Sequence, residues 1–187
     1  MNRDKGEPLQ FFSEIRDVVN VLMFYEDVAY ARLLESVFLR RGVDLGHACM
    51  YVTSDSKDVI LQSMRDQNVD ADKLSNDNLF HAVFFDRLTV QTLDSVNEFV
   101  DELKKKKMTA RIVVRFDTPN MVQDSELLKL EQFFLQLSSQ HDFSILSSYG
   151  ADLVGDNKKG KLVRDNIGMH SHVVFAPSFG YGLVVKI

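Results

Sequence analysis

The chain has 187 residues, of which 45% are hydrophobic and 26% are charged, and its net charge is -5. This length suits one domain, residues 1–187, and makes two full domains unexpected. The negative charge disfavours a nucleic-acid surface, no apolar run is long enough to cross a bilayer, and the single cysteine excludes an intrachain disulfide. We therefore expect a cytoplasmic protein whose partners include neither nucleic acid nor a membrane.

Short apolar runs alternate with helical patterns along most of the chain. The runs are rich in β-branched and aromatic residues, which is typical of strands buried on both faces of a sheet. They occupy residues 18–25, 47–53, 80–86, 111–117 and 143–149. Helical spacing of apolar residues lies between them, over residues 30–38, 56–67, 93–103 and 125–139. The alternation predicts an α/β fold with three layers: a mostly parallel sheet with helices on both faces, in which the first run is a buried central strand.

The C-terminal part departs from this alternation. Residues 150–168 are rich in Gly, Asp, Asn and Lys, which favours an exposed loop. Residues 172–177 and 181–187 are largely apolar and flank a Ser-Phe-Gly turn, so they predict a C-terminal β-hairpin.

The N-terminal end is open to two interpretations. Residues 1–12 begin with a polar sequence, which favours a flexible tail. Alternatively, Phe11, Phe12 and Ile15 belong to an amphipathic helix that packs on the sheet edge or on a second copy of the chain.

The turn after the first predicted strand is the most informative part of the chain. It reads Phe24-Tyr25-Glu26-Asp27 at the position where a RecA-like fold has its glycine-rich phosphate loop. A phosphate loop surrounds its ligand with glycine backbone amides and a lysine, whereas this turn has two carboxylates and no glycine. We therefore expect a RecA-like scaffold that has lost its phosphate chemistry and is not an enzyme.

A second glycine and lysine pattern is found near the C-terminus. Residues 155–161 match G-x-x-x-x-G-K, but the Ser or Thr that would hold magnesium is replaced by Leu162. A true phosphate loop joins an early strand to a helix, whereas only a hairpin is predicted to follow this segment. We interpret it as a solvated loop.

Several short blocks follow one another in an order known from one family of sensory domains. They are the first turn, Gly46-His47-Ala48-Cys49-Met50-Tyr51-Val52, Arg115-Phe116-Asp117, Leu130-Glu131, Tyr149 and His170. On these blocks the chain resembles the MEDS family, the methanogen and methylotroph sensory domains. The resemblance implies a RecA- or KaiC-like fold without a working phosphate loop, a simple organic ligand and an output partner. The chain departs from the family pattern at Ser147-Ser148, where a cysteine often precedes the closing tyrosine, and no kinase or DNA-binding output module is recognised in it.

The predicted strand ends are the expected place for a ligand, because open α/β sheets bind ligands beyond the carboxyl ends of their strands. The predicted ligand-binding residues are Tyr25, Glu26, Asp27, Arg115, Asp117, Glu131, Tyr149 and His170. The aspartates at these ends, which also include Asp55 and Asp86, have an alternative role, since aspartate is a preferred helix cap.

Arg115 and Glu131 are less easily explained as surface residues. Arg115 lies in an apolar strand, and Glu131 lies within the apolar arc of a helix, three residues before Phe134. Both groups are costly to bury alone, so we expect them to meet in one interior region whose walls include Tyr25 and Tyr149. They pair with each other or face a ligand, unless Glu131 escapes at the helix rim.

The histidines are weak evidence for a metal. His170 and His172 are two residues apart, which on a strand places both rings on one face, but no third ligand is identifiable. We expect no metal and no cofactor.

Three functional hypotheses remain. The first is a non-catalytic sensory or regulatory domain that binds a small organic molecule of unknown identity at the strand ends. The second is an interaction protein, a degenerate RecA- or KaiC-like regulator of a signalling partner or a homo-oligomer. The third, an enzyme, rests only on the carboxylates and histidines.

Overall fold

The computed structural model describes residues 7–84, 90–116, 124–153 and 165–187. Its elements, in chain order, are α1 (Pro8–Glu14), β1 (Asn20–Tyr25), α2 (Val28–Asp44), β2 (Ala48–Thr53), α3 (Lys57–Asp66), α4 (Ala71–Asn76), β3 (Phe80–Phe84), α5 (Val90–Lys106), β4 (Ala110–Phe116), α6 (Asp124–His141), β5 (Ser144–Gly150), the 3-10 helix η1 (Ala151–Leu153), β6 (His172–Ser178) and β7 (Tyr181–Lys186). No helix among these residues is both long and apolar enough to span a membrane.

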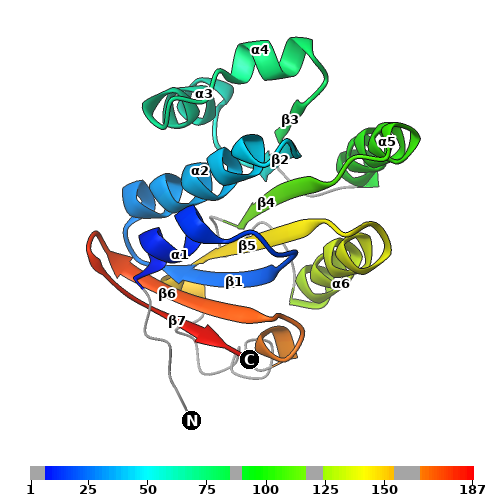
Figure 1. Cartoon of the computed structure of the whole chain (residues 1–187). Helices are drawn as coiled ribbons and strands as arrows, with labels where there is room; N and C mark the ends of the chain where they lie inside the picture. The colour runs from blue at the N-terminus through cyan, green and yellow to red at the C-terminus, as the bar shows by residue number, and fades with distance from the viewer. Residues whose placement is uncertain (1–6, 85–89, 117–123, 154–164) are drawn as a thin grey trace.

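The strands form one seven-stranded sheet in the order β3-β2-β4-β5-β1-β6-β7 (Figure 1). β1 lies between β5 and β6 and is parallel to both, so the predicted central strand is confirmed. β6 and β7 pair antiparallel and form the predicted C-terminal hairpin, whose turn contains Gly180 at a φ of 76°. All other neighbouring strands are parallel. The mostly parallel α/β fold is therefore confirmed.

Helices cover both faces of the sheet and complete three layers (Figure 1). One core lies beneath α1, α2, α3 and α4, and the other lies beneath α5 and α6. Successive strand residues point to opposite faces, so that Val113 of β4 belongs to the α2 core, whereas Ile112 and Val114 belong to the α6 core. Both faces are apolar because both are covered.

The N-terminal residues include a helix that packs on the molecule. In α1 the side chain of Phe12 is fully buried, and its ring lies 5.9 Å from that of Phe38 in α2. The expectation of a flexible tail is therefore wrong for residues 8–12, because burial of an aromatic side chain opposes fraying. Residues 1–6 lie outside the described part of the chain.

The expected loop at 150–168 is also partly wrong. Gly150 is the buried last residue of β5, and η1 follows it directly. Asn166 is buried, 4% exposed, within a helical turn. Residues 154–164, including the second glycine and lysine pattern, lie outside the described residues.

Candidate functional site

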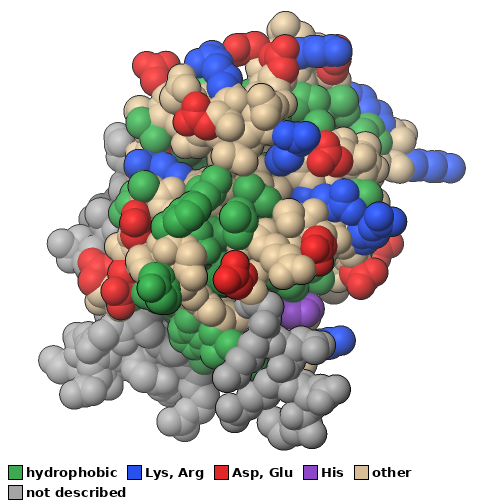
Figure 2. Space-filling view, turned by 60° about the vertical axis from the view of Figure 1, so that its left-hand side comes forward, with side chains coloured by type: hydrophobic (Ala, Val, Ile, Leu, Met, Phe, Trp, Pro, Cys, Tyr) green, Lys and Arg blue, Asp and Glu red, His purple; other side chains and the backbone are tan. Residues whose placement is uncertain are grey.

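A pocket of about 470 Å³ lies at the carboxyl ends of β1, β2 and β5. We call it the strand-end pocket. It is lined by Tyr25, Glu26, Val28, Arg32, Asp55, Gly150, Ala151 and Asp152. Figure 2 brings this end of the sheet forward and shows acidic and hydrophobic side chains side by side on the face. Of the predicted ligand-binding residues, Tyr25 and Glu26 line the pocket, and Asp117 lies outside the described residues.

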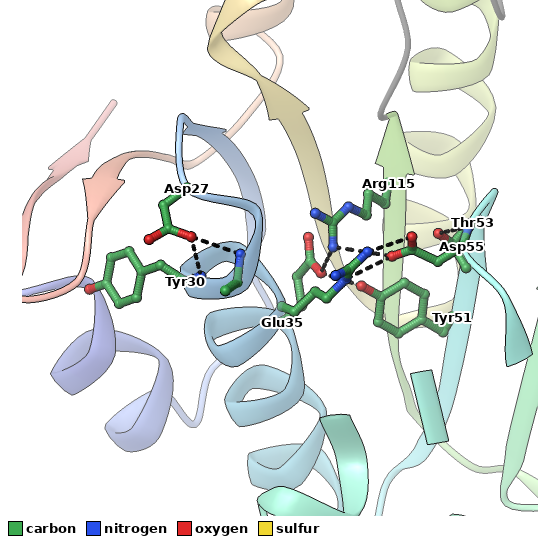
Figure 3. Close-up of polar contacts among 9 residues, drawn as sticks. Asp27, Tyr30, Glu35, Tyr51, Thr53, Asp55 and Arg115 are labelled. Carbon is green, nitrogen blue, oxygen red and sulfur yellow. Dashed lines mark hydrogen bonds and ion pairs between the residues drawn. The ribbon is translucent and has the colours of Figure 1, made fainter. Parts of the chain in front are cut away.

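Asp27 caps α2 beside the pocket (Figure 3). Its Oδ1 accepts hydrogen bonds from the backbone amides of Ala29, at 2.8 Å, and Tyr30, at 3.1 Å. These amides belong to the helix N-terminus, which is the group that binds phosphate in a phosphate loop. Because an internal carboxylate already occupies them, this turn is not a phosphate site.

Arg32 and Asp55 form an ion pair in the wall of the pocket. Nε of Arg32 donates to Oδ2 of Asp55 at 3.0 Å, and Nη2 donates to Oδ1 at 2.7 Å. This two-point geometry is the strong form of a guanidinium–carboxylate contact. The amide of Asp55 donates to Oγ1 of Thr53, and its side chain does not cap α3, whose N-cap residue is Ser56. Asp55 is therefore an ion-pair partner and not a helix cap.

Arg115 lies behind this pair, fully buried beneath α2 (Figure 3). Its Nη1 is 3.0 Å from Oε2 of Glu35 and 3.6 Å from Oδ2 of Asp55. The hydroxyl of Tyr51 donates to Oε2 of Glu35, and the guanidinium carbon lies 5.0 Å from the centre of the Tyr25 ring. Two guanidinium groups thus meet two carboxylates in a continuous network that begins at the pocket and ends inside the core.

The hydroxyl of Tyr51 stays protonated in this network. Burial raises the pKa of Tyr51 well above its usual value of 10, and the nearby carboxylate of Glu35 raises that pKa further. The tyrosine therefore serves as a neutral donor to Glu35.

The expected meeting of Arg115 and Glu131 is wrong, because the two side chains lie on opposite faces of the sheet. Arg115 shares the α2 face with Val113, whereas Glu131 is carried by α6, which covers the other face. The expectation that Glu131 is buried is correct, since the residue is 0% exposed. Tyr25 and Tyr149 are separated in the same way, each beside a different charged residue.

Glu131 is the centre of a second, separate cluster. Its Oε2 accepts from the hydroxyl of Ser147 at 2.8 Å, and its Oε1 accepts from the hydroxyl of Tyr149. Nε2 of His170 is 3.5 Å from Oε2, while Nδ1 is 2.7 Å from the backbone oxygen of Asn166. A carbonyl oxygen only accepts, so Nδ1 carries a proton. Glu131, Tyr149 and His170 are thus brought together, but on the face of the sheet opposite to the Arg115 network.

The histidine pair does not have the geometry expected for a metal. His170 precedes β6, whereas His172 begins it, so the two rings do not share one strand face. The ring of His172 packs on Phe11, with centroids 5.1 Å apart. Among the described residues, no group of three or more His, Cys, Asp or Glu side chains is arranged to hold a metal ion.

Comparison with solved structures shows the same architecture in another protein. A KaiC-like protein from the hyperthermophilic archaeon Pyrococcus horikoshii OT3 matches 90% of this chain and 79% of its own length, with a TM-score of 0.62 and 16% sequence identity. The fold is KaiC-like. At this identity the likeness shows the fold alone. No protein-family model and no curated protein sequence matches the chain.

Three residues of this KaiC-like domain's network, Arg32, Glu35 and Tyr51, were missed by sequence reasoning. A signal was present for Glu35, which stands among the apolar residues of α2, as Glu131 does in α6. Asp152 of the pocket had no such signal, because it lies in a segment whose composition favours a loop.

Proposed function

We propose that this protein is a non-catalytic sensory or regulatory domain that binds a small organic molecule in the strand-end pocket. The observation that carries the proposal is the pocket itself. Its volume, about 470 Å³, falls within the range of roughly 300–1,000 Å³ that is typical of small-molecule sites. It also lies at the carboxyl ends of parallel strands, where α/β sheets bind their ligands.

The first turn supports a function other than nucleotide hydrolysis. Asp27 takes the free amides of α2, and Glu26 adds a second carboxylate at the pocket. Phosphate groups would be repelled at this point, whereas a phosphate loop attracts them.

The buried charge network supports a sensing role. Asp55 lines the pocket and is shared between Arg32 and Arg115, and Arg115 also binds Glu35 of α2. A ligand that contacts Arg32 or Asp55 therefore acts on a chain of ion pairs that leads to the middle of a helix. Such a chain is a physical route by which occupancy of the pocket changes a distant surface.

The resemblance to the MEDS family supports the same proposal. It implies a simple organic ligand and a signalling partner that receives the response. The KaiC-like fold is compatible with this resemblance, but fold alone does not determine function.

A fragment screen by ¹H–¹⁵N NMR tests the proposal. We expect uncharged and charged fragments of ten to fifteen heavy atoms (about the size that the pocket holds) to shift the amide resonances of Gly150, Ala151 and Asp152. Ala151→Phe places a ring in the pocket and should abolish these shifts. Ser63→Phe, in the separate hollow between α2 and α3, is the matched control and should leave them unchanged. A screen in which no fragment affects the pocket would refute the proposal.

Assembly is the second candidate, and one observation favours it. The turn of the β6–β7 hairpin exposes two large aromatic side chains, Phe179 at 65% and Tyr181 at 72%. Exposed aromatic residues are enriched in protein interfaces. Sedimentation of the wild-type chain and of a Phe179→Ser/Tyr181→Ser variant separates the candidates, because only an interface at the hairpin makes the mass fall in the variant.

A further inference from the structure

The lining of the strand-end pocket is unbalanced in charge. It contains three carboxyl side chains, Glu26, Asp55 and Asp152, and one guanidinium, that of Arg32, which leaves two negative formal charges. Arg32 and Asp55 neutralise each other through their two hydrogen bonds. The remaining charge of the lining therefore comes from Glu26 and Asp152.

The cationic groups around the pocket are balanced within the protein. Arg115, behind the wall, is paired with Glu35. The N-terminus of α2, which carries a partial positive charge, is capped by Asp27. Neither group offsets the two carboxylates of the lining, so the pocket favours a positively charged ligand.

The size and walls of the pocket indicate an organic cation. No group of three or more metal-binding side chains is present in the described part of the chain. A volume of about 470 Å³ far exceeds a metal ion. The ring of Tyr25 forms one wall, and it already contacts a guanidinium at 5.0 Å. Aromatic rings attract ammonium groups as they attract guanidinium groups.

We infer that the strand-end pocket selects a small organic cation, an amine or a quaternary ammonium compound, and that Glu26 and Asp152 provide the selectivity. This inference rests on the proposed function, since it names the ligand class of the same pocket. It goes beyond the resemblance, which implies a simple organic ligand of no stated charge.

Gly150 is the residue that places the carboxylate of Asp152. A Cβ atom added at Gly150 would lie 2.6 Å from Oδ1 of Asp152 and 3.9 Å from the hydroxyl oxygen of Tyr25. Only glycine therefore leaves room for this carboxylate in its present position. Gly150→Ala displaces the carboxylate without changing the charge of the protein, which separates the geometry of the pocket from its net charge.

The experiment compares four probes of similar size: benzylammonium, benzyltrimethylammonium, benzyl alcohol and benzoate. Dissociation constants are measured from the NMR shifts of the full chain. We expect the two cations to bind at least tenfold more tightly than benzoate, with benzyl alcohol between them. Raising the salt concentration from 20 mM to 500 mM should weaken the cations and leave benzyl alcohol unchanged, because salt screens charge (Debye length about 3 Å at 1 M).

Four variants identify the residues that carry the selectivity. Glu26→Gln, Asp152→Asn and Gly150→Ala should each weaken binding of the cations by about three- to tenfold. Asp44→Asn is the matched control. It removes the same charge at the other end of α2, where Asp44 pairs with Arg40 on the surface, and should leave all four constants unchanged.

The outcomes separate the inference from the proposed function. Equal binding of all four probes, or tighter binding of benzoate, overturns the inference and leaves the pocket a small-molecule site. A loss of cation binding in Asp44→Asn as large as in Asp152→Asn also overturns it, because the net charge of the protein would then be responsible. If no probe shifts the pocket resonances while other fragments do, the inference fails alone. If no fragment of any kind shifts them, both fail.

Discussion

Replacement of Glu35 by alanine tests the charge network that lies behind the pocket. The change removes the carboxylate that binds Arg115, whose side chain is 0% exposed. Breaking a buried ion pair from one side costs about 3–5 kcal/mol, because the remaining charge stays buried without compensation. Asp55, 3.6 Å from Nη1, compensates part of that charge. Tyr51 loses its acceptor, which costs about 1 kcal/mol. We therefore expect a loss of about 3–4 kcal/mol, near the lower end of this range.

Urea unfolding measures this loss directly. The midpoint concentration should fall with little change in slope, and the melting temperature should fall by roughly 10 °C. A double change, Glu35→Leu with Arg115→Met, replaces both charges by apolar groups and should cost much less than Glu35→Ala alone. Arg40→Ala, which breaks the exposed pair with Asp44, is the control and should cost less than about 1 kcal/mol.

Two results would refute this reasoning. The first is a cost for Glu35→Ala no larger than that of the Arg40→Ala control, which would mean that Arg115 is compensated elsewhere. The second is a double variant at least as unstable as the sum of its single changes, which would mean that the two residues do not act as a pair.

Three further predictions concern other parts of the molecule. Burial raises the pKa of Cys49 to about 12, so at pH 8 the native thiol should react with an aromatic disulfide reagent far more slowly than the thiol in urea, and equal rates would contradict this. Burial, and then the carboxylate of Glu131, raise the pKa of Tyr149 well above 10, so the stabilisation is complete below pH 10 and is lost at higher pH. The unfolding free energy should fall above pH 10 by up to about 1.4 kcal/mol per pH unit for this group, and Tyr149→Phe should flatten the profile. Finally, the chain should not hydrolyse ATP or GTP with magnesium; turnover above a buffer control that is lost in Lys161→Ala would show that residues 155–161 form a phosphate loop.

The general fold could be read from the sequence because it depends on local patterns. Alternating apolar runs and helical stripes predict a parallel α/β sheet, and the run that became β1 was correctly placed at its centre. The hairpin of β6 and β7 was predicted from two apolar runs around a glycine turn. The N-terminal helix was misjudged in favour of a tail, since the burial of Phe12 depends on Phe38 of α2, which is distant in the chain.

The position of the pocket was also accessible from the sequence, because it follows from topology. Parallel strands place their carboxyl ends at one edge of the sheet, and Tyr25 and Glu26 were expected there. Their role in binding stays a prediction. The contribution of Asp152 could not be foreseen, since it depends on the path of the chain after β5 and on the space above Gly150.

The partners of the buried charges were decided by the tertiary structure alone. The sequence showed that Arg115 and Glu131 each require compensation, because burying a charge is costly. It did not show on which face each side chain lies, because a strand that is covered on both sides has no alternation of polar and apolar residues from which the face can be read. Arg115 consequently pairs with Glu35, 80 positions away, while Glu131 binds Ser147 and Tyr149 on the other side of the sheet. A local pattern determines that a charge is buried, but only the packing of helices on the two faces determines what neutralises it.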